Sequence, residues 1–321
     1  MKLCIITCWF GKLPTYFEIW KKSCENNKNI DFLLFTDQEI TNYSDNLIIE
    51  RMNLKDLKKL FEKKLNMRIS LENAYKICDF RPAFGIIFED YLKGYDYWGH
   101  CDIDQVWGKI EDFIVKININ DYERINHNGP FSLYKNNKKM NTMFKNKGAK
   151  FSYKEVFTNK ENYAFDEFTG INMICLKNNV KSFYFKEYGD LEVSHCRYTI
   201  KQLNNYKVQS YLLENQKLFR VFYKGNVLNK EELIYIHFQK KKPNIKDNIK
   251  LNEYILMGSA CFDNINKITK KSIEKSNPYK GLIYEIIENI IYYLKKIRTF
   301  ILSNNKIKRI WIIQKFFRGK I

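Results

Sequence analysis

Two aspartates separated by one residue, Asp102 and Asp104, are the side chains best placed for chemistry in this sequence. Carboxylate oxygens are hard ligands that suit Mg²⁺ or Mn²⁺. In an extended segment alternate side chains lie on the same side, so both carboxylates can point into one crevice. One can bind a cation there directly and the other through a water. The pattern is common by chance, and a surface aspartate is usually only solvated. It predicts a divalent metal site only where the fold supports one.

The segment that carries the pair, YDYWGHCDIDQVWG (95–108), favours a ligand site. Its aromatic and apolar start predicts a strand that ends at the aspartates, and the carboxyl ends of strands form the ligand crevice in open α/β sheets. The aromatic residues around the pair are expected to form a rim that excludes water. They are Tyr95, Tyr97, Trp98 and Trp107.

A later strand-like segment, LIYIHFQKKK (233–242), ends in His237 and a lysine run. A neutral imidazole there can complete a site of two carboxylates, although a lone histidine is more often structural. Lys240 can reach phosphate oxygens as a point charge, and the alternative is a solvated lysine run. The sequence therefore predicts Asp102, Asp104 and His237 as metal ligands.

Two adjacent acids, Asp166 and Glu167, precede an apolar run in AFDEFTGINMICL (164–176), which we expect to be a strand. One acid can take the proton of an attacking hydroxyl group while the other binds the acceptor. The alternative for both is a helix cap. Asp37, at the end of an earlier expected strand, can accept a hydrogen bond from a base or ribose, or can be a turn residue.

The elements that would position these side chains alternate between strands and helices. Strands are predicted at LCIITCWF (3–10), IDFLLFTD (30–37) and NLIIE (46–50), and helices at 16–24 and 54–65. Buried strands that alternate with helices favour a mostly parallel sheet covered on both faces. The predicted fold class is therefore α/β.

The segments on either side of the aspartate pair add further expected elements. Residues 73–92 look helical around Pro82, and their Lys76, Asp79 and Arg81 can share one face. Residues 122–135 are strand-like, with a turn at Asn128 and Gly129. A lysine-rich helix or loop follows.

Composition sets wider limits. With 321 residues, 45% of them hydrophobic, the chain can bury a large core, and its formal charge of +19 would attract phosphates, nucleic acid or anionic lipid. The eight cysteines lack zinc-ligand spacing and are expected to be reduced thiols. The start of the chain does not fit a signal peptide, and no run of about 18 apolar residues occurs. We expect a cytoplasmic chain without a transmembrane span.

The segment from about residue 279 onward predicts a basic amphipathic helix. Residues 279–321 contain ten Lys and Arg against two Glu, together with Trp311. Aliphatic residues recur there at helical spacing: Leu282, Ile283, Ile286, Ile287, Ile290, Leu294, Ile297 and Ile301. An interfacial membrane anchor needs such a pattern, and the alternative is a helix packed on the domain with a lysine-coated outer face.

Six segments of the chain, taken in order, resemble a bacterial family of glycosyltransferases of capsule, lipopolysaccharide or other surface polysaccharide synthesis. They are CWFGKLPTYFEIWKKSCENNKNIDFLLFTD, YKICDFRPAFGIIF, YDYWGHCDIDQVWG, NHNGPFSLYKN, YAFDEFTGIN and IHFQKKK. The resemblance implies a GT-A fold over residues 1–245, Rossmann-like with a mixed, mostly parallel sheet flanked by helices. The nucleotide-sugar half would span about 1–115 and the acceptor half about 116–245. Residues 246–321 would form a helical basic amphipathic tail.

The resemblance also implies roles for single residues. Asp102 and Asp104 match the metal-binding D-x-D motif, and His237 matches a histidine that completes the metal site. Asp166 and Glu167 resemble the acidic element that supplies the base of inverting members. Thr7, Trp9 and Phe10 with Asp37 resemble nucleoside contacts, and Lys76, Asp79 and Arg81 resemble donor-side polar residues.

The expected function is transfer of a sugar, with a UDP-hexose as the expected donor, to a glycan or lipid-linked glycan in a reaction that depends on Mn or Mg. The expected location is the inner face of the plasma membrane, bound peripherally to anionic lipid through residues 279–321. No nucleic-acid partner is expected, and the oligomeric state stays open. One alternative is a haloacid-dehalogenase-type phosphatase, because D-I-D-Q-V fits its nucleophile motif. That motif normally follows the first strand of its core, whereas here at least three strand-like segments precede it. Another is a non-enzymatic basic module that binds membrane or nucleic acid.

Overall fold

The main sheet of the protein is built around the buried strand β1 (Leu3–Trp9). The computed structural model describes residues 1–303, 305, 307, 309, 310, 312 and 313, without the side chain of Asn128. Strand order is β3-β2-β1-β4-β7-β6-β8, and four of the six pairings are parallel. The other strands are β2 (Ile30–Thr36), β3 (Leu47–Arg51), β4 (Tyr97–Cys101), β6 (Arg124–Asn128), β7 (Phe131–Lys135) and β8 (Ser182–Phe183). The α/β class and the mixed sheet are confirmed.

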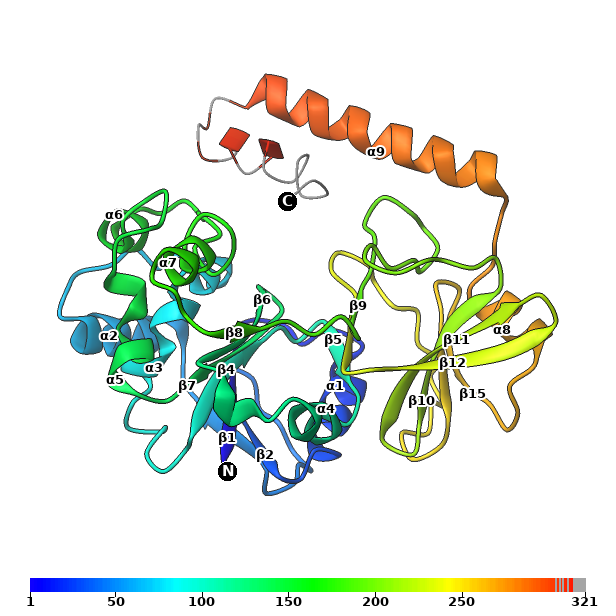
Figure 1. Cartoon of the computed structure of the whole chain (residues 1–321), viewed down its shortest axis with the longest axis horizontal. Coiled ribbons are helices and arrows are strands. Elements are labelled where there is room, and N and C mark those ends of the chain that lie inside the picture. The colour runs from blue at the N-terminus through cyan, green and yellow to red at the C-terminus, as the bar shows by residue number, and fades with distance from the viewer. Residues whose placement is uncertain (304, 306, 308, 311, 314–321) are drawn as a thin grey trace.

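Helices cover both faces of this sheet because the side chains of each buried strand alternate between two cores (Figure 1). From β1, Cys4 and Ile6 enter one core, while Leu3 and Ile5 enter the other. The second core is covered by α1 (Phe17–Glu25) and α4 (Ile110–Lys116). The first is covered by α2 (Leu54–Leu65), η1 (Ala74–Ala83), α3 (Phe84–Ile87), α5 (Lys138–Asn141), η3 (Met143–Lys145), α6 (Tyr153–Thr158) and α7 (Ile171–Lys177). A short 3-10 turn, η2 (Ile119–Asp121), follows α4.

Helix α7 corrects one expectation, because the run after Asp166 and Glu167 was expected to be a strand. Its buried residues Ile171, Ile174 and Cys175 lie three and four positions apart, which is the period of a helix. The apolar residues of this run are nearly continuous, so the sequence does not show the helical period. The turn between β6 and β7 also falls one residue later than expected, at Gly129 and Pro130.

A second lobe contains a five-stranded antiparallel sheet with the order β12-β11-β10-β14-β15. It comprises β10 (Gln209–Glu214), β11 (Lys217–Lys224), β12 (Val227–Leu233), β14 (Ile255–Met257) and β15 (Phe262–Asn264), and α8 (Lys270–Ser276) packs on it. The helical tail was expected to begin at 246, but β14 and β15 lie in that segment and Tyr211 pairs with Met257. Pairing across 46 positions leaves no local signal, which is why the helical prediction extended too far.

The two lobes are joined by a three-stranded sheet of β5 (Gln105–Trp107), β13 (Tyr235–His237) and β9 (Gly189–Asp190). Val106 and Ile236 enter the core of the second lobe, whereas Trp107 and Tyr235 enter the core of the first. This small sheet therefore fixes the end of β13 relative to the loop that carries Asp102 and Asp104.

A long helix, α9 (Leu282–Leu302), runs across both lobes (Figure 1). No helix among the described residues combines the length and apolarity that crossing a bilayer requires. Trp311 and residues 314–321 of the predicted tail lie outside the described residues. All eight cysteines fall within the described range and are unpaired.

Candidate metal centre

Asp102 and Asp104 lie directly after β4, at the carboxyl end of the parallel part of the main sheet. The chain leaves β1 toward β2 on one side, and β4 lies on the other, so the pair sits where a ligand crevice forms in such sheets. The amide of Asp102 donates to the carbonyl of Pro130 (3.1 Å), and the amide of Phe238 donates to the carbonyl of Asp104 (2.8 Å). Both aspartates are thus fixed by backbone contacts. They follow β4 rather than β1, which is not where the phosphatase alternative places its motif.

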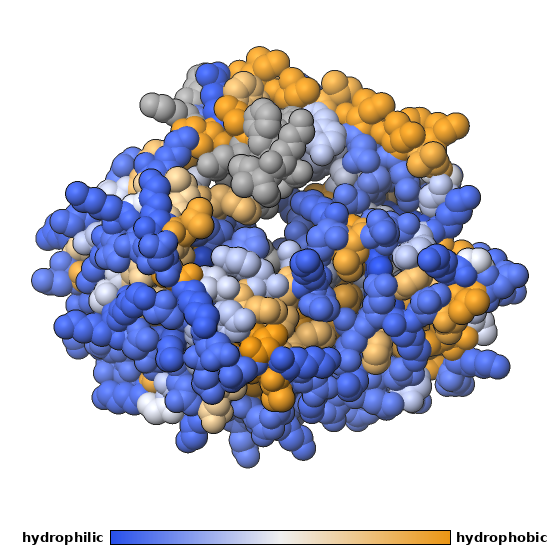
Figure 2. All heavy atoms as spheres, viewed as in Figure 1, coloured by the Kyte–Doolittle hydropathy of each residue, from blue (hydrophilic) through white to orange (hydrophobic). Residues whose placement is uncertain are grey.

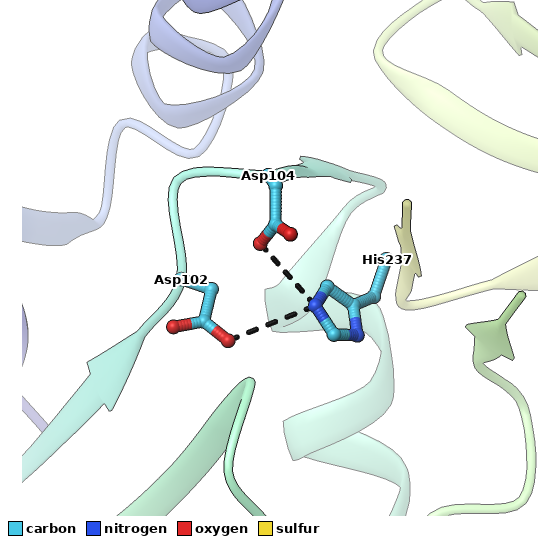
Figure 3. A group of neighbouring side chains, drawn as sticks. All are labelled: Asp102, Asp104 and His237. Atoms are coloured by element: carbon cyan, nitrogen blue, oxygen red, sulfur yellow. Dashed lines mark ion pairs between the residues drawn. The ribbon is translucent and has the colours of Figure 1, made fainter. Parts of the chain in front are cut away.

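The end of β13 brings His237 to the two aspartates (Figure 3). Its Nε2 lies 3.2 Å from Oδ1 of Asp104 and 3.7 Å from Oδ2 of Asp102. One ligand atom from each of the three side chains lies within 4.8 Å of the others. Adjacent ligands of an octahedral ion bound at about 2.1 Å are about 3 Å apart. The three donors therefore fit Mg²⁺ or Mn²⁺ in both chemistry and spacing.

Asp190, at the end of β9, was not predicted and orients the histidine. Its Oδ1 lies 2.9 Å from Nδ1 of His237 and accepts a hydrogen bond from Nε2 of Gln239 (2.6 Å). A carboxylate on one ring nitrogen directs the other nitrogen toward a metal. The dipeptide Gly189-Asp190 carries no local signal of this role, because the parallel pairing of His237 with Asp190 is a tertiary contact.

The charge balance of the centre follows from these contacts. Burial lowers the pKa of the His237 imidazole, but the Asp104 carboxylate and then Asp190 outweigh it, so the pKa lies well above its ordinary value. Without an ion the imidazolium offsets the charge of the carboxylates. A metal ion would take over that positive charge and bind the neutral imidazole.

Arg81, from η1, links the aspartate pair to the acidic pair at 166–167. Its guanidinium bonds Oδ1 of Asp102, and it also donates to Oδ2 of Asp166 (3.0 Å) and to the carbonyl of Gly129 (2.8 Å). Asp102 therefore faces Arg81 with one oxygen and His237 with the other. Burial raises the pKa of Asp166 well above its ordinary value, and the charge of Arg81 acts in the opposite direction.

Glu167 lies against Gly129, whose carbonyl accepts a hydrogen bond from Arg81. A Cβ on Gly129 would lie 2.5 Å from Oε1 of Glu167, so only glycine allows the carboxylate this close to the turn. Asp166 is 3% exposed, whereas Glu167 is half-buried. The structure thus brings Arg81, Asp102 and Asp166 into contact and places Glu167 against the neighbouring Gly129 turn.

Lys76 and Asp79 are not at the surface of the centre, which corrects their prediction as donor contacts. Both side chains are buried and form an ion pair of 2.8 Å. Oδ2 of Asp79 accepts the amide of Tyr163 (2.9 Å), and Oδ1 accepts the amide of Phe165 (2.9 Å). The pair therefore positions the segment that leads into Asp166.

The expected nucleoside contacts lie around the ends of β1 and β2. Thr7 is buried, with its hydroxyl 2.8 Å from Sγ of Cys101. Trp9 is half-buried and donates from Nε1 to the carbonyl of Lys12 (3.3 Å), while Phe10 packs against the first core. Asp37 is exposed and accepts the amide of Gly11 (2.9 Å). Hydrogen bonds from Gln38 and then from Gly11 lower the pKa of Asp37.

The expected aromatic rim is wrong. Tyr97, Trp98 and Trp107 are fully buried core residues, and Tyr95 donates to Oδ2 of Asp31 (2.6 Å). Their alternation within buried strands sends them into the two cores rather than over the crevice. Lys240 is exposed beyond β13, three residues after His237.

Two other tyrosines, which the sequence did not single out, lie near the acids. Burial raises the pKa of Tyr16, and the charges of Asp104 and then Asp102 raise it further, which places its hydroxyl within electrostatic range of both. Tyr75, on η1, is 68% exposed and lies within electrostatic range of Asp166 and Asp102. These rings were missed because neither is close to the acids in sequence.

Comparison with known proteins assigns the chain to a family. The chain belongs to a family of unknown function (DUF6625), whose profile matches residues 5–277. The matched region covers both lobes from Ile5 onward, includes every residue of the candidate centre, and ends before α9. A search of curated proteins finds no match.

Proposed function

We propose that this protein is a metal-dependent glycosyltransferase of the GT-A type that transfers a sugar from a nucleotide-sugar donor, a UDP-hexose in the first instance. The acceptor would be a glycan or lipid-linked glycan of a bacterial surface polysaccharide. The observation that carries the proposal is the convergence of Asp102, Asp104 and His237 at the carboxyl end of β4. Departure of a nucleoside diphosphate builds negative charge, and a site of this kind can neutralise it.

In this proposal Asp102, Asp104 and His237 hold a divalent cation, which would stabilise the charge that develops on the departing diphosphate. Asp190 holds the ring of His237 so that Nε2 faces the aspartates. Arg81 occupies the other oxygen of Asp102 and so fixes the direction of that carboxylate. Its guanidinium also adds fixed positive charge beside the site.

The donor would lie between the candidate metal centre and two exposed side chains, Tyr75 and Lys240. The ring of Tyr75 offers an exposed surface on which a base or sugar can stack. Lys240, three residues beyond His237, offers a positive charge for phosphate oxygens.

For the acceptor we propose Glu167 as the base and Asp166 as a positioning residue. Asp166 is nearly inaccessible and is held by Arg81, whereas the half-buried Glu167 lies against the Gly129 turn. A base must reach the hydroxyl whose proton it removes, which favours the more accessible acid. This assignment applies to an inverting reaction.

The test is a thermal-shift screen of UDP-, GDP- and CMP-sugars with and without Mn²⁺. One nucleotide class should raise Tm by about 5 °C at saturating concentration, and only in the presence of metal. Asp104→Asn should abolish the shift and reduce release of the nucleoside diphosphate by about 100-fold or more. The matched control is Asp45→Asn, an exposed aspartate between β2 and β3. The proposal fails if no nucleotide gives a metal-dependent shift, or if Asp104→Asn retains it.

A further inference from the structure

Helix α9 contacts the rest of the protein through a polar edge, formed by Glu285, Glu288 and Asn289. Glu285 pairs with Nε of Arg197 (3.2 Å), and Glu288 accepts the amide of Cys196 (3.1 Å). Nδ2 of Asn289 lies 3.1 Å from Nε2 of His195. Glu288 and Asn289 lie three and four positions after Glu285, so the three side chains share one side of the helix. The edge docks on the loop between β9 and β10.

The aliphatic face of α9 points the other way. It consists of Ile283, Ile286, Ile287, Ile290, Leu294, Ile297 and Ile301, which are 44% to 74% exposed. At about 100° per residue, the centre of this face lies roughly opposite the polar edge. Figure 2 shows the resulting hydrophobic band along the helix. A helix that packs on its own domain normally buries its apolar side, so here the usual arrangement is reversed.

Most of the charged residues in the segment that contains α9 are basic. Lys280, Lys295, Lys296 and Arg298 belong to the described part of this segment, and its two acids, Glu285 and Glu288, are turned toward the body. The whole chain carries a formal charge of +19. A surface that complements the face must therefore be apolar and negatively charged.

The helix is braced against both lobes. His195 and Arg197, at its start, belong to the loop before β10, and Ile307, beyond its end, packs against the first core. The ammonium of Lys241 donates to the carbonyl of His195, and Lys241 is four residues from His237. The loop under α9 is thus connected to the metal centre through Asp190 on one side and His237 on the other.

We propose that α9 lies flat on an anionic lipid bilayer, with its aliphatic face in the headgroup and acyl boundary and its polar edge on the protein. A helix with an exposed aliphatic face and an opposed polar edge is suited to lie in the interface. Tyr284 and Tyr293, both exposed, suit the same depth. The lysines and the arginine of this segment add attraction to acidic headgroups. This proposal does not depend on the glycosyltransferase reaction.

The experiment is cosedimentation of the full chain with vesicles of phosphatidylcholine, with and without phosphatidylglycerol, in the absence of nucleotide. The unmodified protein should bind the anionic vesicles, and added salt should weaken the binding. Ile290→Glu with Leu294→Glu should reduce binding by about 10-fold or more, because two charges would enter the apolar boundary. The matched control is Val227→Glu with Leu176→Glu, two exposed aliphatic residues that belong to β12 and α7 rather than to α9.

A charge variant separates lipid attraction from simple hydrophobic adhesion. Lys295→Glu with Arg298→Glu should weaken binding to anionic vesicles by about 10-fold while leaving the circular dichroism spectrum unchanged. Equal binding of all variants would overturn the proposal. A second result would also overturn it: the unmodified chain does not bind vesicles but forms a dimer in light scattering, and Ile290→Glu with Leu294→Glu dissociates that dimer. The aliphatic face would then bind a second copy of the chain.

Discussion

At the candidate metal centre, Asp104 and His237 come from segments far apart in the chain and turn toward one another. On α9, Glu285 and Glu288 come from one helix and turn toward the body. The centre depends on buried supports such as the Lys76–Asp79 pair, whereas Arg197 under α9 also donates to the carbonyls of Tyr206 and Lys207. Removing Lys76 would leave the carboxylate of Asp79 with neutral amide partners and no access to water, whereas the side chain of Glu285 is 19% exposed. The same kind of ion pair should therefore matter much more near the centre than under the helix.

The largest effect is expected from Lys76→Met. Removing the ammonium leaves the fully buried carboxylate of Asp79 without a compensating charge, which should lower the free energy of unfolding by about 3–5 kcal/mol. Urea denaturation measures the loss. The matched control is Lys59→Met, in an exposed pair with Asp56, where a change within about 0.5 kcal/mol is expected. Similar losses for the two variants would show that burial does not distinguish these pairs.

A smaller effect is expected from Asp190→Ala, which removes the carboxylate on Nδ1 of His237. The ring would lose its fixed orientation, so affinity for Mn²⁺ should fall by about 10- to 100-fold in calorimetric titration. Asp190→Asn keeps a hydrogen-bond acceptor, so its affinity for Mn²⁺ should lie between that of the unmodified protein and that of Asp190→Ala. Unchanged affinity in both variants would mean that Asp190 does not orient a metal ligand.

The smallest effect is expected from Glu285→Gln. Arg197 keeps its two backbone carbonyl partners, so the free energy of unfolding should change by about 1 kcal/mol or less. Hydrogen exchange of α9 amides should nevertheless become faster, because the polar edge is weakened. Glu274→Gln on α8 is the control for a helical acid outside this edge. A loss as large as that of Lys76→Met would contradict the comparison.

Much of the first lobe could be predicted because its signals are local. The apolar runs of β1, β2 and β3 and the helix α2 lie where their patterns place them, and Asn53 caps α2 through the amide of Asp56. The second lobe was not predicted. Its strands β14 and β15 are three residues each and are defined by pairing with distant segments.

The sequence by itself determined the residue types of the centre: a D-x-D pair at a strand end, a histidine at another, and two adjacent acids. Tertiary structure alone decided that His237 faces Asp104, that Asp190 orients it, and that Lys76 and Asp79 are buried supports. It also decided which side of α9 meets the protein. The physical reason is that composition and spacing describe one segment at a time, whereas burial and contact depend on which segments the folded chain brings together.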